Sequence, residues 1–139
     1  MRNILILFLS AFFFFSCDNE KNCEGIDLDK EYEIAINERL QICPKNFYLT
    51  LLNIQDSRCP NGIVCIWQGM IVIEATVTID GKEHDFQLST NETASGFPVQ
   101  LSTEGYIIKL IDATPYPNQN DSSNPDNKRA VLLISKRSS

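Results

Sequence analysis

The residues of this sequence best suited to do chemistry are its five cysteines. Cys17 directly follows an apolar N-terminal run, whereas Cys23, Cys43, Cys59 and Cys65 form an even set that can pair in three ways. Pro-Asn-Gly, a turn-forming sequence, lies between the last two, so we expect Cys59 to bond to Cys65 and Cys23 to bond to Cys43. Zinc needs closely spaced cysteine pairs or histidine partners, and these cysteines are separated by 19, 15 and 5 residues. Disulfides in an oxidising compartment are therefore favoured over a metal site.

Few other residues are of the types that catalyse reactions. The single histidine, His84, stands in a polar stretch that is typical of a solvent-exposed hairpin and not of a general base. The sequence has no nucleophile-elbow, zinc-protease, phosphate-loop or dinucleotide-binding motif. Asp121 and Asp126 carry oxygen ligands that suit calcium, but their stretch lacks a calcium-loop signature and favours an ordinary loop. We therefore predict a protein that is not an enzyme and that holds no cofactor or metal.

The first sixteen residues predict export. Arg2 is followed by the mainly apolar residues 4–15, which as a helix would rise about 18 Å, well short of the roughly 30 Å hydrocarbon core of a bilayer. The segment therefore indicates a signal peptide and not a membrane span. Its end, Phe-Phe-Ser-Cys, resembles the lipobox of bacterial lipoproteins, with Phe14 where leucine is usual. The resemblance implies cleavage before Cys17 and acylation of its thiol, for example with palmitate; an ordinary secretory signal is the alternative.

On this interpretation the chain has three parts: a removed signal at 1–16, a lipid-anchored acidic leader at 17–30 and a β domain at 31–139. Two acyl chains hold a protein stably on a bilayer, so the expected location is the cell envelope, with the outer membrane favoured and the membrane side left open. Removing residues 1–16 takes away one arginine and leaves 11 basic against 18 acidic residues, a formal charge of −7. This charge argues against a nucleic-acid partner and against attachment to anionic lipid through basic residues.

The most distinctive motif is Asp-Ser-Arg-Cys-Pro-Asn-Gly-Ile-Val-Cys-Ile-Trp-Gln-Gly at residues 56–69. One interpretation makes Arg58 and Trp67 a recognition pair, with a fixed fork of donors beside an aromatic face. The favoured interpretation is structural: a disulfide loop joins two strands, Asp56 and Arg58 tie the loop down, and Trp67 packs over the sulfurs. Trp67 lies in phase with the apolar face of the strand that follows, so we expect it to be buried.

The same motif also carries a family resemblance. Together with Gly-Tyr-x-Ile-x-Leu from Gly105, a later Pro-Tyr-Pro and a closing apolar strand at 130–134, it is similar to a family of small exported bacterial β domains without an assigned activity. The similarity covers residues 32–136. It implies the fold and export, and it brings no catalytic residues. The candidate recognition residues in these motifs are Arg58, Trp67 and Tyr116.

Apolar and polar residues alternate along the mature chain, and no segment keeps a helical period. This pattern predicts that the candidate residues are positioned by β-strands. The strands are expected at 31–37, 47–55, 67–79, around Phe86 and Leu88, at 97–101, 106–110 and 130–134. Asp80-Gly81 and Glu104-Gly105 predict tight turns, and the composition of 89–96 and 115–128 predicts loops. We predict an all-β fold, a single antiparallel β-sandwich or small barrel of about seven strands.

Taken together, these features predict a lipid-anchored envelope domain with a binding or structural role. One class of function is a protein or peptide binder that uses sheet edges or the 115–128 loop, including an inhibitor of a partner enzyme. The other is a β-barrel that binds a small molecule or metal in its interior. A filled sandwich favours the first class, and a closed barrel with a cavity favours the second.

Overall fold

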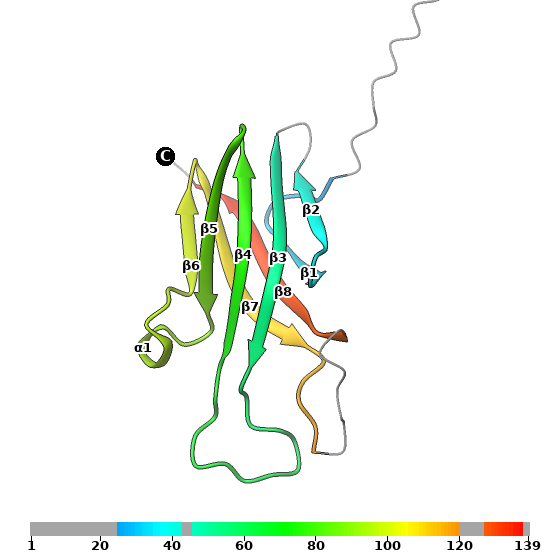
Figure 1. The fold of residues 1–139 in the computed structure, drawn as a ribbon, viewed down its shortest axis with the longest axis vertical. Helices are drawn as coiled ribbons and strands as arrows, with labels where there is room; N and C mark the ends of the chain where they lie inside the picture. The colour runs from blue at the N-terminus through cyan, green and yellow to red at the C-terminus, as the bar shows by residue number, and fades with distance from the viewer. Residues whose placement is uncertain (1–24, 43–45, 120–126, 138–139) are drawn as a thin grey trace, which may run out of the picture.

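The computed structural model describes residues 25–42, 46–119 and 127–137. These residues fold into two antiparallel sheets of four strands each. One sheet has the strand order β1-β8-β7-β6 and the other β2-β3-β4-β5 (Figure 1). The strands are β1 Lys30–Ala35, β2 Arg39–Ile42, β3 Phe47–Asp56, β4 Ile71–Ile79, β5 Lys82–Ser89, β6 Gln100–Thr103, β7 Tyr106–Thr114 and β8 Arg129–Lys136, and a short helix, α1, spans Glu92–Ser95. The predicted all-β antiparallel fold is confirmed, and of the two architectures left open the sandwich is the one that forms.

The core lies between the two sheets and is built by period-two alternation. In β4 every second side chain from Ile71 to Ile79 is buried, while Glu74, Thr76 and Thr78 are only half-buried on the other face. Both sheets supply fully buried residues, among them Ile34, Phe47, Leu49, Leu51, Ile73, Leu88, Ile108, Leu132 and Ile134. Burial of each such side chain contributes about 1.5–3 kcal/mol. Ile26 and Leu28, just before β1, also pack against this core.

Two tight turns connect neighbouring strands as the sequence predicts. Asp80 and Gly81 join β4 to β5 with φ of 48° and 79°, and Glu104 and Gly105 join β6 to β7 with φ of 45° and 82°. Two successive positive φ values give the backbone twist that matches a right-handed pair of strands. Glycine adopts positive φ values without steric cost, which explains why glycine occupies the second position of each turn.

One strand was missed, two predicted strands begin too early, and β7 continues to Thr114, four residues past its predicted end. The four-residue strand β2 was not expected; it follows a turn at Asn37, whose φ is 64°, and it pairs with β3. β4 begins at Ile71 and not at Trp67, and β6 begins at Gln100 and not at Phe97. In the last two cases alternating apolar residues continue beyond the ladder of hydrogen bonds, so periodicity alone places the strand start too early. The predicted loop at 89–96 contains the short helix α1.

Two β-bulges interrupt the long strands near the same end of the sandwich. In β3 the register shifts between Leu51 and Asn53, so Leu52 is an extra residue and its side chain is exposed. In β7 the register shifts between Leu110 and Asp112. A bulge re-aims the side chains beside it. Each of these two therefore shifts the phase of its strand, so that Ile54 and Ala113 face the core where regular alternation would turn them outward.

The two ends of the sandwich differ in construction. Both tight turns, the first described residues and the last strand's end lie at one end, which we call the turn end (Figure 1). The long connection at residues 57–70, between β3 and β4, lies at the other end beside residues 115–119 (Figure 1). We call this second end the tip. Among the described residues, no helix has the length and apolar character that crossing a bilayer requires.

Candidate functional site

The tip loop, residues 57–70, begins with a narrow neck where its two arms are hydrogen-bonded. The amide of Ser57 donates to the carbonyl of Met70 at 2.9 Å, and the amide of Cys59 donates to the carbonyl of Gln68 at 2.9 Å. Gly69 sits in this neck with a φ of +73°, and a Cβ at this position would lie 1.9 Å from the carbonyl oxygen of Ser57. Only glycine allows this approach of the two arms.

The loop is closed by a disulfide between Cys59 and Cys65 with an S–S distance of 2.04 Å. This confirms the predicted pairing of these two cysteines, and Cys17, Cys23 and Cys43 lie outside the described residues. Within the closed ring the amide of Ile63 donates to the carbonyl of Pro60 at 3.3 Å, which is the turn expected from Pro-Asn-Gly. On the chain-entropy model, a seven-residue ring contributes about 2.4 kcal/mol to stability.

Arg58 ties the loop to both sheets. Its Nε and Nη2 donate to the two carboxylate oxygens of Asp56 at 2.8 and 2.7 Å, in a bidentate pair. Its Nη1 donates to Oδ1 of Asp112 at 2.6 Å, and Nη2 also donates to the carbonyl of Ala113 at 2.7 Å. The side chains of Arg58 and Asp56 are 9% and 5% exposed. The structural interpretation of Asp56 and Arg58 is therefore confirmed, and four donor contacts of Arg58 are made within the protein.

Lys128 completes this network from the other side of the tip. Its Nζ donates to Oδ2 of Asp56 and, at 2.9 Å, to the carbonyl of Pro115. Burial raises the pKa of Asp56, but the hydrogen bonds from Arg58 and Lys128 lower it by more, so the net pKa lies below the ordinary value of 3.8. Burial likewise lowers the pKa of Arg58, and its bonds to Asp56 outweigh that effect and raise it. Both groups therefore stay charged throughout the neutral range.

A second segment, residues 115–119, docks on the tip loop. The amide of Asn61 donates to the carbonyl of Pro117 at 2.9 Å, and the amide of Gln119 donates to the carbonyl of Asn61 at 3.2 Å. The guanidinium of Arg58 lies 4.5 Å from the centre of the Tyr116 ring. The two motifs that the sequence suggested, the cysteine motif and Pro-Tyr-Pro, are thus brought together at one end of the molecule.

Large apolar side chains project from this stapled framework into solvent. Val64 and Ile66 are fully exposed at 99% and 108%, and Ile63 and Tyr116 are about half-exposed. Trp67 is 52% exposed. We call these five residues the tip patch. Scattered apolar residues are ordinary on a protein surface, but four on one disulfide-closed loop, with a fifth on the segment bonded to it, are typical of a binding surface.

The expectation of a buried Trp67 is therefore wrong. Its apolar phase with Ile71 was extrapolated through Gly69, but the left-handed φ of that glycine changes the chain direction before β4 begins. Arg58 is also not a free recognition donor, because its donors bind Asp56, Asp112 and Ala113. Of the three candidate recognition residues, Trp67 and Tyr116 are exposed, and Arg58 belongs to the framework and contacts the Tyr116 ring.

Sequence reasoning missed the most exposed members of the tip patch. Val64 and Ile66 flank Cys65, and their signal is an apolar run across the end of a disulfide ring that is too short to bury it. The partners Asp112 and Lys128 had no such signal, because they lie 54 and 70 residues from Arg58 in the chain. Only the fold brings them within bonding distance of the network.

His84 departs from its predicted setting. It pairs with Val77 across the β4–β5 ladder, so it shares the inward face, and it is half-buried where solvent exposure was expected. Its Nε2 is buried and makes no hydrogen bond within the described part of the chain. Among those residues, no three His, Cys, Asp or Glu side chains gather closely enough to hold a metal ion. Asp121 and Asp126 are outside the described ranges.

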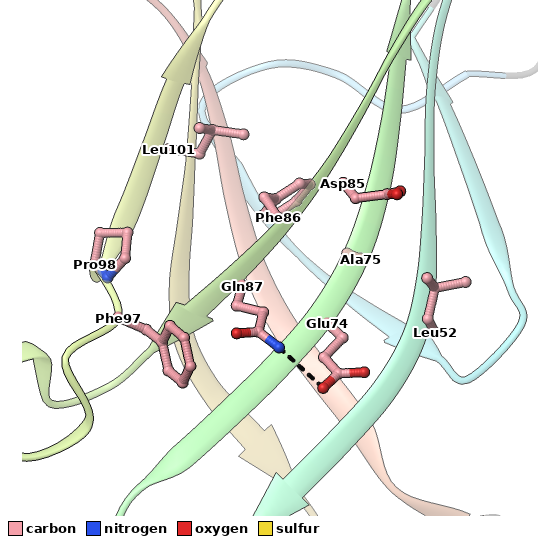
Figure 2. A pocket seen from close by; sticks show the side chains of 9 residues that line it. All are labelled: Leu52, Glu74, Ala75, Asp85, Phe86, Gln87, Phe97, Pro98 and Leu101. Atoms are coloured by element: carbon pink, nitrogen blue, oxygen red, sulfur yellow. Dashed lines mark hydrogen bonds between the residues drawn. The ribbon is translucent and has the colours of Figure 1, made fainter.

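A second surface feature is an open groove of about 660 Å³ on the β2-β3-β4-β5 sheet, at its β5 side. Figure 2 shows Phe97, Gln87, Glu74 and Leu52 one after another across this surface. Gln87 donates to Oε1 of Glu74 at 3.0 Å in the middle of the row. Leu52 and Phe97, at the two sides, are exposed apolar residues. We call this feature the outer groove.

No protein-family model, curated protein or solved structure matches this chain.

Proposed function

We propose that this protein is a lipid-anchored protein of the bacterial cell envelope that binds a partner protein through the tip patch. Support for the anchor comes from residues 1–16 and Cys17, where a short apolar signal ends in a sequence that resembles a lipobox. The outer membrane is the proposed location. The observation that carries the binding role is the exposure of Val64 and Ile66 on a loop held by a disulfide and a buried ion network.

Rigidity is what turns these exposed residues into a binding surface. Association immobilises side chains and loops, at a cost of about 0.5–1.5 kcal/mol for each rotamer-rich side chain. At the tip, the Cys59–Cys65 ring, the neck hydrogen bonds and Arg58 fix the backbone before any partner arrives. Valine and isoleucine also have few rotamers to lose. The loop therefore presents apolar area at a low entropic cost.

The anchoring membrane is a poor occupant for the tip patch. From Cys17 to Gly25, the first described residue, the chain spans at most about 29 Å when fully extended. The ten residues of β3 alone extend about 33 Å from the turn end to the tip. A chain anchored from the turn end therefore cannot invert to bring the tip end-on into the same bilayer. Arg58 is the only charged residue in the tip loop and is already paired, so anionic lipid finds no free cation there.

The sandwich interior favours a protein partner over an internally bound small molecule. Its two inner faces are filled by the hydrophobic core, including Phe47 and Tyr106, whose rings lie 4.9 Å apart. The tip patch is instead a projecting surface, suited to a concave apolar pocket on another protein. If that pocket is the active site of an enzyme, binding of the tip patch would inhibit it.

The anchor is tested by Cys17→Ser in the full chain, expressed with labelled fatty acid. We expect the variant to lose the label and to leave the membrane fraction, because acylation is its only proposed attachment. The domain should still fold, since Cys17 lies outside all the described strands. A variant that still carries label and sediments with membranes would refute the anchor.

The binding role is tested by photo-crosslinking in the native envelope. A photoreactive amino acid replaces Ile66 in the acylated protein, and the matched control carries it at Glu83, an exposed site on β5 near the turn end. We expect a defined protein adduct from position 66 that disappears when Trp67→Ser and Val64→Ser are added. Equal adducts from both positions, or only lipid adducts from position 66, would contradict the proposal.

A further inference from the structure

The outer groove is a second surface with its own construction, separate from the tip. Its two apolar walls, Leu52 and Phe97, are both exposed; Leu52 lies at the bulge of β3, and Phe97 lies in the connection between α1 and β6. Between them lie the side chains of Glu74 and Gln87 on the sheet surface (Figure 2).

Both walls are held in place before any ligand binds. Leu52 is the extra residue of the bulge in β3, whose flanking residues remain paired with β4. Phe97 follows α1, and its amide donates to Oγ of Ser95 at 3.0 Å. The next residue, Pro98, accepts a hydrogen bond from the amide of Ser89 at 2.9 Å, which fixes the segment against the end of β5. The groove is therefore preformed.

The groove also has a definite charge. Glu74 and Asp85 line it, and no lysine or arginine is among the described residues that do so. Gln87 holds Oε1 of Glu74, and Oγ1 of Thr76 donates to Oδ1 of Asp85 at 2.6 Å. An ionised carboxylate accepts about four hydrogen bonds, so each group keeps capacity for a charged donor. Glu74 lies between the two apolar walls and Asp85 lies to the side of that row (Figure 2), an arrangement that matches a cation flanked by apolar groups.

We propose that the outer groove binds an extended segment of a partner protein in which a lysine or arginine is flanked by apolar side chains. The cation would lie between Glu74 and Asp85, and the neighbouring apolar side chains would pack on Leu52 and Phe97. The groove is open, so it suits an extended chain segment. Sites for small molecules usually enclose most of the surface of the ligand. This proposal does not depend on the tip patch or on the lipid anchor.

The test is a titration of the isotope-labelled native protein, in mild detergent, with short capped peptides followed by amide NMR shifts. The probe is Leu-Lys-Leu-Lys-Leu, and the comparison peptides are Leu-Glu-Leu-Glu-Leu and Gly-Lys-Gly-Lys-Gly. We expect the probe to shift amides around Leu52, Glu74 and Phe97, and both comparison peptides to bind at least about fivefold more weakly. Equal binding of the glutamate peptide, or shifts confined to other surfaces, would overturn the proposal.

Substitutions then separate charge from apolar contact. Glu74→Gln keeps the shape and should weaken probe binding by about two- to fivefold, the range for a solvent-exposed ion pair. The matched control is Glu83→Gln, which removes an exposed carboxylate that does not line the groove, and it should leave binding unchanged. Equal weakening by both would mean that net charge alone attracts the peptide, which would refute the site.

Phe97→Ala should weaken the probe by about tenfold, because an aromatic wall is lost while the exposed position keeps the fold intact. Leu52→Ala provides the same test from the opposite wall. Ile66→Ser, at the tip, should leave peptide binding unchanged, so failure at the groove and failure at the tip are told apart. Unchanged binding in both wall variants would overturn the proposal.

Discussion

The two ends of this sandwich connect their strands in opposite ways. At the turn end, two-residue turns at Asp80-Gly81 and Glu104-Gly105 suffice, and the nearby ion pair between Lys82 and Glu104 is exposed and 3.2 Å long. At the tip, a fourteen-residue loop is held by a disulfide, by a glycine neck and by a buried network around Asp56. The residues of the two turns determine the conformation of the turn end, whereas contacts between residues far apart in the chain determine the conformation of the tip.

This difference shows where the molecule maintains a surface that folding does not require. A tight turn could join β3 to β4 as one joins β4 to β5. Instead the chain keeps exposed Val64 and Ile66 on a loop whose framework is buried and charged. The framework stabilises the sandwich, but the exposed apolar side chains do not, so we favour binding as the reason why the loop carries them.

The largest expected effect comes from breaking the network at Asp56. Asp56→Ala leaves the cations of Arg58 and Lys128 without their shared carboxylate, and loss of one member of a buried pair typically costs about 3–5 kcal/mol. The matched change at the turn end, Glu104→Ala, removes an exposed pair and should cost less than about 1 kcal/mol. Urea unfolding of both variants measures the difference, and equal losses would contradict the contrast between the ends.

Glycine substitutions compare the ends at the level of the backbone. Gly69→Ala combines a left-handed φ with a clash against the carbonyl of Ser57, so we expect a loss of about 3 kcal/mol. Gly81→Ala has a similar φ of +79° but nothing within 4 Å of the added Cβ, so only about 1 kcal/mol should be lost. Thermal unfolding measures both variants. A Gly69→Ala loss no larger than that of Gly81→Ala would mean that the neck is not closed.

Removing the disulfide should have the next largest effect. The double variant Cys59→Ser, Cys65→Ser should lose about 2.4 kcal/mol, which for a domain of this size lowers the melting temperature by roughly 10 °C. Non-reducing peptide mapping of the native protein should show the Cys59–Cys65 bond and also the expected bond between Cys23 and Cys43. Recovery of all four as free thiols would reverse the argument for an oxidising compartment.

Acid should weaken the tip through Asp56. Its pKa in the folded protein is below the ordinary 3.8, so its ionised form stabilises the fold above that pH, and this contribution is lost as the pH falls through the lowered folded pKa. We expect the stability of the native protein to fall below pH 3.8 more steeply than that of Asp56→Ala. Denaturant unfolding at a series of pH values measures the slopes. Identical slopes would show that Asp56 is not ionised within a stabilising network.

The smallest effects on stability are expected in the tip patch itself. Ile66→Ser and Trp67→Ser should change the free energy of unfolding by no more than about 0.5 kcal/mol, because the side chains are exposed. Leu49→Ala in the core, as a comparison, should cost about 2–5 kcal/mol. The same tip variants should lose the crosslinked partner. If Trp67→Ser lowered the free energy of unfolding by several kcal/mol, Trp67 would have to be buried in the core.

Local sequence signals predicted much of the fold. Alternation located the interiors of the long strands, and Asp80-Gly81 and Glu104-Gly105 marked both turns. Alternation placed the start of β4 before Ile71, because a side-chain pattern carries no information on where the ladder of hydrogen bonds begins. Adjacent leucines at 51 and 52 break the alternation of β3, which is the available signal for the bulge beside the outer groove.

The candidate site was predicted only where its parts are close in the chain. Asp56, Arg58 and the Cys59–Cys65 ring fall within one motif, so their association could be expected. Asp112 and Lys128 reach Arg58 and Asp56 through the pairing of β7 with β8. The exposure of Trp67 depends on the chain direction set at Gly69, which follows from its contact with Ser57 across the neck.

The fluorescence of Trp67 tests the central claim most directly, because it is the only tryptophan of the chain. The claim is that the tip presents its apolar side chains to solvent in the folded, unbound protein. Acrylamide quenching of the purified native protein should therefore be strong and close to that of the unfolded chain, with emission characteristic of a hydrated indole. Weak quenching with blue-shifted emission would place Trp67 in the interior and contradict the account of the tip as a binding surface.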